Sequence, residues 1–162
     1  MATIDLPNNI LEALSTVLQQ LQHSLPEVKQ APDFSAIAFK WENGELKPIH
    51  QLKRIELNDL KGIERQKEKV LQNTEQFLNG LPANDVLLTG SRGTGKSSIV
   101  RALLTEYAEQ GLRLIEIERD DLSELPEIQK LIAERPEKFI VYCDDLAFNA
   151  EDENYRSLKS VL

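Results

Sequence analysis

The chain has little of several features that commonly define a function. Its single cysteine, Cys143, excludes an internal disulfide, and its two histidines give no Cys/His spacing typical of a zinc site. No apolar run approaches the roughly 20 residues that cross a membrane, and the N-terminus lacks the pattern of a signal peptide. We therefore expect a cytoplasmic protein without membrane association.

Positive charge is also in short supply. The 162 residues carry 27 acidic and 19 basic side chains, and the resulting net charge of −8 disfavours a standing nucleic-acid surface. The basic residues between positions 53 and 69 are interleaved with acidic ones, which is typical of a solvated helix face. Nucleic acid is therefore not an expected partner.

What the chain does have is a glycine-rich octapeptide, GSRGTGKS, at residues 90–97. It matches the phosphate-binding pattern G-x-x-x-x-G-K-[ST], in which glycines let backbone N–H groups approach a phosphate. We predict a buried strand at residues 85–89 and a helix at residues 98–110, so that the helix N-terminus also faces the anion. The residues expected to bind nucleotide here are Gly90, Ser91, Arg92, Gly93, Thr94, Gly95, Lys96, Ser97 and Ser98.

Two of these residues have distinct chemical roles in the pattern. Lys96 is a point charge that reaches the β- and γ-phosphates, and the Ser97 hydroxyl is a ligand for Mg²⁺. The alternative, a glycine turn without a ligand, is disfavoured because the flanking sequence predicts the strand and the helix that the motif requires.

A second motif, FIVYCDD, occupies residues 139–145. The apolar run predicts a strand buried in a parallel sheet, and its C-terminal end carries two carboxylates to the edge where α/β sheets bind ligands. This is the Walker B pattern, so we expect Asp144 to hold Mg²⁺ beside Ser97 and Asp145 to orient the attacking water. The alternative is an apolar strand that ends in a polar turn.

The rest of the chain divides into three predicted parts. Residues 1–33 carry an amphipathic helix over 7–23 and a proline-containing linker, and residues 34–56 carry a β-hairpin around Asn43-Gly44. Residues 57–162 form an alternating β-α-β-α-β nucleotide-binding unit, with helices predicted at 63–80, 98–110, 120–135 and 152–162 and strands at 85–89, 112–117 and 139–143. The predicted fold class is α/β, a P-loop NTPase three-layer fold with a parallel sheet.

Several separate blocks carry a resemblance to a known family: FKWENGELKPI, LNDLKGIERQKEKVLQNTEQFLNG with the P-loop after it, EYAEQGLRLIEIERDDL and RPEKFIVYCDDLAF. From about residue 39 onward the chain resembles a little-characterised bacterial family of ATP-binding proteins in the AAA+ superfamily. Its DLKGI segment is similar to the segment whose backbone lines the adenine pocket in AAA+ proteins. The resemblance implies ATP rather than GTP, and it implies that Leu60, Lys61, Gly62 and Ile63 contact the base.

Two departures from the AAA+ pattern change the expectation. Asp145 stands where AAA+ proteins usually have glutamate, and its shorter side chain implies slow hydrolysis. The fourth strand with its sensor residue, the arginine finger and the helical lid of AAA+ proteins have no counterpart within these 162 residues. We therefore expect an N-terminal fragment of a longer protein, with a gap or an abnormal pairing in its sheet and with Asp144 poorly placed relative to Ser97.

The resulting hypothesis is an AAA+-type module that binds ATP and Mg²⁺, with ATP hydrolysis in the complete protein. Water would attack the γ-phosphate in line, while Lys96, Mg²⁺ and the loop amides stabilise the charge. This chain alone is expected to bind weakly and to turn over little. Two alternatives stay open, a P-loop kinase of a small molecule and a non-hydrolysing, nucleotide-gated module whose N-terminal helix docks a partner. AAA+ resemblance also implies self-assembly.

Overall fold

The computed structural model describes residues 7–24 and 32–146. Contacts within the chain divide it into two compact units, residues 1–31 and residues 32–162. The first unit contains helix α1 (Asn8–Ser24), close to the predicted range of 7–23. The apolar side chains Ile10, Leu14, Val17 and Leu18 of α1 are exposed. The helix predicted at residues 152–162 lies outside the described residues.

A four-stranded sheet with the order β2-β1-β3-β4 forms the centre of the second unit. Its strands are β1 (Ala38–Glu42), β2 (Glu45–Pro48), β3 (Leu112–Ile117) and β4 (Lys138–Cys143). The pairs β1/β3 and β3/β4 are parallel, whereas β2 returns antiparallel to β1. Asn43 and Gly44 both have positive φ, as a two-residue hairpin turn requires. The predicted hairpin thus forms, and its first strand is also part of the main sheet.

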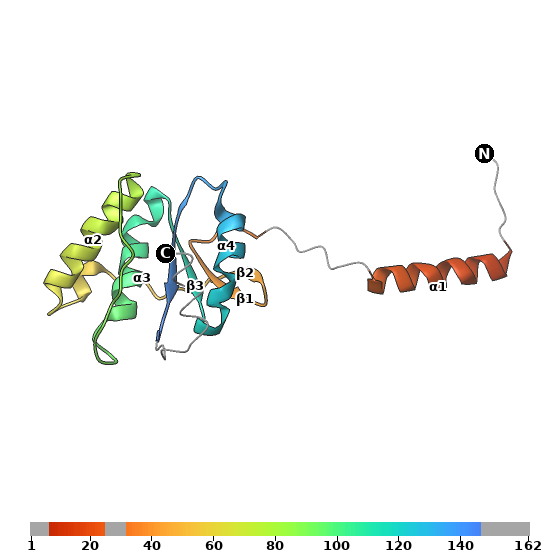
Figure 1. Cartoon of the computed structure of the whole chain (residues 1–162), viewed down its shortest axis with the longest axis horizontal. Helices are drawn as coiled ribbons and strands as arrows, with labels where there is room; N and C mark the ends of the chain where they lie inside the picture. Colours follow the sequence, from red (N-terminus) through yellow and green to blue (C-terminus); the bar gives the residue numbers. More distant parts are fainter. Residues whose placement is uncertain (1–6, 25–31, 147–162) are drawn as a thin grey trace. The chain divides into compact units, whose positions relative to one another are not determined.

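Helices cover both faces of this sheet, which confirms the predicted three-layer α/β fold. Figure 1 shows α2 (Glu64–Leu78) and α3 (Lys96–Tyr107) on one side of β3 and α4 (Leu125–Ile132) on the other. The two faces follow from strand alternation, because Leu114 packs into the cluster under α3 whereas its neighbour Ile115 packs into the cluster under α4.

The boundaries of α3 and α4 reflect local chemistry. The helix α3 is continued by one turn of 3-10 helix (Ala108–Gln110) and ends at Gly111, whose φ of 92° lies in the left-handed region. The single helix predicted over residues 120–135 is wrong at its start, since a 3-10 segment (Arg119–Glu124) precedes α4. Pro126 lies in the first turn of α4, where its missing N–H costs no helical hydrogen bond.

The strand predicted at residues 85–89 is absent. This segment pairs with no strand of the described chain, and Val86 and Leu87 are 48% and 75% exposed. Leu88 nevertheless packs against the cluster under α3, and a reciprocal pair of amide hydrogen bonds between Asn73 and Asn84 holds the start of the segment to α2. An extended apolar run becomes a strand only when another strand satisfies its N–H and C=O groups. Those groups have no such partner here.

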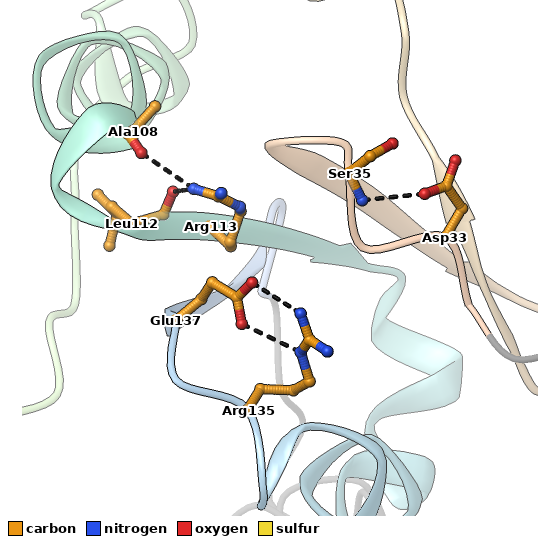
Figure 2. Close-up of polar contacts among 7 residues, drawn as sticks. All are labelled: Asp33, Ser35, Ala108, Leu112, Arg113, Arg135 and Glu137. Carbon is orange, nitrogen blue, oxygen red and sulfur yellow. Dashed lines mark hydrogen bonds and ion pairs between the residues drawn. The ribbon is translucent and has the colours of Figure 1, made fainter.

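Two arginines fix the N-terminal ends of β3 and β4, as Figure 2 shows. Arg113 donates to the carbonyl oxygens of Ala108 and Leu112, which ties the start of the 3-10 turn to β3. Arg135 donates from both Nε and an Nη atom to the Glu137 carboxylate, which fixes the connection between α4 and β4. The opposite, C-terminal ends of parallel strands are the ends at which open α/β sheets bind ligands.

Among residues 7–24 and 32–146, no helix is both long enough and apolar enough to cross a bilayer.

Candidate functional site

The glycine-rich loop at residues 90–95 joins the unpaired segment to the first turn of α3. Its glycines have φ values of 144° at Gly90, 83° at Gly93 and 88° at Gly95, which L side chains rarely adopt. Gly95 is the N-cap of α3, and no side chain caps this helix. The first N–H groups of α3 therefore have no side-chain acceptor at the cap and are oriented toward the loop.

Lys96 folds back over this loop. Its Nζ donates to the carbonyl oxygens of Gly90 at 2.9 Å and Ser91 at 3.0 Å. The Thr94 hydroxyl donates to the same Ser91 carbonyl at 2.8 Å. The side chains of Lys96 and Thr94 thus donate hydrogen bonds to carbonyl oxygens of the loop itself. The ammonium group of Lys96 lies where it would attract the negative charge of a phosphate.

Ser97 and Asp144 meet across 47 positions of sequence. Ser97 Oγ donates to Asp144 Oδ2 at 2.8 Å, which corrects the expectation that Asp144 is poorly placed relative to Ser97. The expectation failed because β4 pairs directly with β3 and so reaches the N-terminus of α3 even though residues 85–89 form no strand. The second motif therefore lies at the glycine loop.

The Asp144 carboxylate is held ionised by its hydrogen bonds. Partial burial opposes the charge, but the Ser97 hydroxyl and the Asp145 N–H, which donates to Oδ1 at 3.0 Å, keep the pKa of Asp144 below its ordinary value. Asp145 has a φ of 51°, which is uncommon outside glycine, and its side chain is exposed. An anionic Asp144 beside a hydroxyl oxygen gives two hard oxygen donors, a set that suits Mg²⁺.

The DLKGI segment lies against the same loop. A Cβ atom built on Gly95 would be 3.5 Å from Ile63 Cδ1, so Ile63 borders the loop directly. Gly62 has a φ of 77°, and its N–H donates to the Glu64 carboxylate. The structure therefore brings Ile63 to residues 90–97.

Sequence reasoning did not single out Lys67, which holds this segment in place. Its Nζ donates to the carbonyl oxygens of Leu57 at 3.0 Å and Leu60 at 2.9 Å. A half-buried lysine among the alternating charges of α2 gives no signal that separates it from its solvated neighbours.

Tyr142 was also missed as a neighbour of the site. It belongs to β4, which ends at Cys143, and it lies two residues before Asp144. That spacing was readable from the sequence, but aromatic residues in a buried strand usually belong only to the core.

Two clefts of the described chain lie away from the glycine loop. One of about 500 Å³ is lined by residues of α2, and one of about 700 Å³ runs between α2, the C-terminal part of α3 and residues 54–58. Both are lined by several glutamates, and neither involves residues 90–98. Within the described ranges, no cluster of three or more His, Cys, Asp or Glu side chains could hold a metal ion by itself.

Comparison with known proteins places the chain in a family. Residues 34–162 match the family described as protein of unknown function (DUF815). The chain belongs to this family. A stretch of 52 residues is 36% identical to a replication factor C large subunit from Methanococcus maripaludis, covering 32% of this chain and 11% of that protein. No solved structure gives a significant match.

Proposed function

We propose that the chain is a nucleotide-binding module of AAA+ type that binds ATP together with Mg²⁺. The observation that carries the proposal is the 2.8 Å hydrogen bond from Ser97 to Asp144, because it joins the two sequence motifs at one point. The similarity of part of the chain to a replication factor C large subunit supports a nucleotide-binding role.

Each motif residue receives a role in this proposal. Lys96 leaves the loop carbonyls and pairs with the β- and γ-phosphates, while N–H groups of residues 90–98 bind the phosphate oxygens. Ser97 and Asp144 hold Mg²⁺, which would neutralise charge on the β- and γ-phosphates. Backbone groups of residues 60–63 line the base.

Hydrolysis is proposed as slow. Asp145 would orient a water toward the γ-phosphate, but its carboxylate is one methylene shorter than that of glutamate and its side chain lies exposed to solvent. A long or poorly aligned contact with the water gives weak general-base assistance. ATP binding is therefore the main proposed property, and hydrolysis is a slow step that follows binding.

The test replaces Lys96, with an exposed lysine as the matched control. A Lys96→Ala variant is expected to bind a fluorescent ATP analogue in Mg²⁺ at least tenfold more weakly than the wild type, a loss of about 1.4 kcal/mol. Lys130→Ala, which changes an exposed residue of α4, is expected to bind as the wild type does. Equal affinities of the wild type and Lys96→Ala would refute the proposed site.

A phosphate-release assay on the same samples separates the proposed function from a non-hydrolysing module. Slow release by the wild type that is lost in Asp145→Asn, with nucleotide binding retained, supports the hydrolase. Binding without any release by the wild type favours a nucleotide-gated interaction module. The exposed apolar residues Ile10, Leu14, Val17 and Leu18 of α1 would then be the first surface to test for a partner.

A further inference from the structure

The Tyr142 hydroxyl is an unpaired polar group inside the protein. The oxygen is buried, and it makes no hydrogen bond. Its ring packs against the apolar cluster beneath α3, and the residue as a whole is half-buried. Buried hydroxyl groups in native proteins nearly always have a partner, and an exception calls for an explanation.

The acceptors near the Tyr142 hydroxyl limit which group can be its hydrogen-bond partner. Glu116 lies opposite Tyr142 in the β3/β4 register, but its carboxylate is engaged by Arg101 at 3.4 Å. Ser97 and Asp144 lie close enough to influence the phenol, but neither meets hydrogen-bond geometry with it. Burial raises the pKa of Tyr142 to about 12, the Ser97 hydroxyl counteracts this and the Asp144 carboxylate adds to it. Any tyrosine hydroxyl is protonated at neutral pH, so the phenol is available as a hydrogen-bond donor.

Asp144 still has capacity to accept that donor. A carboxylate offers about four lone-pair sites. In the structure Asp144 accepts from the Ser97 hydroxyl at Oδ2 and from the Asp145 N–H at Oδ1. A third donor on the α3 side would fix the plane of the carboxylate, and a fixed carboxylate is a better metal ligand than one free to rotate.

We propose that Tyr142 is a positioning residue of the metal site, whose hydroxyl donates to Asp144 when Ser97 and Asp144 hold Mg²⁺. This inference rests on the proposed function. The hydroxyl is left unpaired without the metal, and pairing it becomes part of the free energy of metal binding. Tyr142 acts through Asp144 and does not itself touch the nucleotide.

The experiment compares two tyrosine variants that each lose one hydroxyl. Tyr142→Phe removes the unpaired group. Tyr107→Phe is the matched control on α3. It removes a hydroxyl that donates to Glu75 at 2.9 Å, and Tyr107 lies at the opposite end of the helix from Ser97. Two quantities are measured on the full chain: the melting temperature without nucleotide, and the Mg²⁺ concentration at half-maximal enhancement of binding of a fluorescent ATP analogue.

The two variants are expected to behave oppositely. Tyr142→Phe leaves the melting temperature unchanged or raises it, because an unsatisfied buried group is removed. It raises the half-maximal Mg²⁺ concentration about tenfold, as expected from loss of a hydrogen bond to a charged group, and leaves binding in EDTA unchanged. Tyr107→Phe lowers the melting temperature and leaves the Mg²⁺ dependence unchanged.

Each contrary outcome has a defined meaning. A Tyr142→Phe variant with the Mg²⁺ dependence of the wild type overturns the inference and leaves the proposed function intact. A fall in its melting temperature as large as that of Tyr107→Phe also overturns it, since the hydroxyl would then be bonded without metal. A wild type that binds nucleotide without any effect of Mg²⁺ refutes the metal half of the proposed function, and the inference falls with it.

Discussion

At the scale of single residues, Gly95 couples the backbone of the glycine loop to the start of α3. Its φ of 88° would cost an alanine about 1–2 kcal/mol, although the added Cβ would meet Ile63 only at an ordinary contact distance of 3.5 Å. We predict that Gly95→Ala lowers the free energy of unfolding by about that amount and weakens binding of the ATP analogue more than tenfold. Urea unfolding and fluorescence titration measure the two effects.

Gly111 provides the control for this prediction. It has nearly the same φ, 92°, and open space around the position of a Cβ atom, but it ends the 3-10 turn after α3. Gly111→Ala should therefore lose a similar free energy of unfolding and bind the nucleotide as the wild type does. If both variants bind equally, the loop conformation does not matter for the ligand.

At the scale of elements, the connection between α4 and β4 depends on an ion pair with a pH-dependent contribution. The two hydrogen bonds from Arg135, opposed by partial burial, hold the pKa of Glu137 below its ordinary value. The pair therefore stabilises the folded state above the unfolded pKa of about 4.5, and this contribution is lost as pH falls through the lower folded pKa.

We predict that Glu137→Gln lowers the free energy of unfolding by about 0.5 kcal/mol at pH 7, because the pair is only partly shielded from solvent. The difference from the wild type should shrink as the pH falls below about 4.5, which urea unfolding at several pH values measures. Glu127→Gln in the more exposed pair with Lys130 should change less. A Glu137→Gln deficit that persists undiminished at pH 3 would contradict the prediction.

Several elements could be predicted from the sequence because one local rule decided each of them. The range 112–117 for β3 and the turn at Asn43-Gly44 follow from alternating apolar residues and turn chemistry. The segment 85–89 has the same apolar signal, yet it forms no strand because pairing depends on a neighbour that local pattern does not reveal. The joining of β1 to β3 is a long-range choice of the same kind.

The candidate site, too, could be predicted from the sequence only in part. The glycine conformations and the roles suggested for Lys96 and Ser97 follow from motif chemistry, and their roles stay a prediction. The Walker B pattern predicted Asp144 beside Ser97, but whether β4 reaches α3 without a strand at residues 85–89 depends on packing that the pattern does not reveal. Lys67 and Tyr142 were missed because their residue types are ordinary in a helix and a buried strand, and only their partners distinguish them.

At the scale of the molecule, the two apolar clusters share the strands β1, β3 and β4. Leu104 belongs to the cluster under α3 and Ile128 to that under α4, and both are almost fully buried. We predict that Leu104→Ala and Ile128→Ala each cost about 2–5 kcal/mol, the usual cost of a cavity in a core. Because the sheet is common to both, each substitution should destabilise the opposite face as well.

The single tryptophan makes this test simple. Trp41 is 2% exposed, lies in the cluster under α4 and donates to Glu124 at 2.6 Å. Its fluorescence therefore reports the α4 face, and Leu104→Ala should still lower the urea midpoint of this signal strongly. A midpoint that moves only for Ile128→Ala would show that the two faces unfold separately.

The contacts of Lys96 with its own loop have a further consequence for the heat of ligand binding. Because Nζ already has two carbonyl acceptors, an arriving phosphate exchanges acceptors rather than adding them. The number of hydrogen bonds made by the lysine then changes little, so bond number adds little to the binding enthalpy. Its contribution comes from replacing neutral carbonyl oxygens by charged phosphate oxygens as acceptors. Removing Lys96 would also relax the empty loop, so part of the lost affinity would be the cost of rebuilding the loop around the ligand.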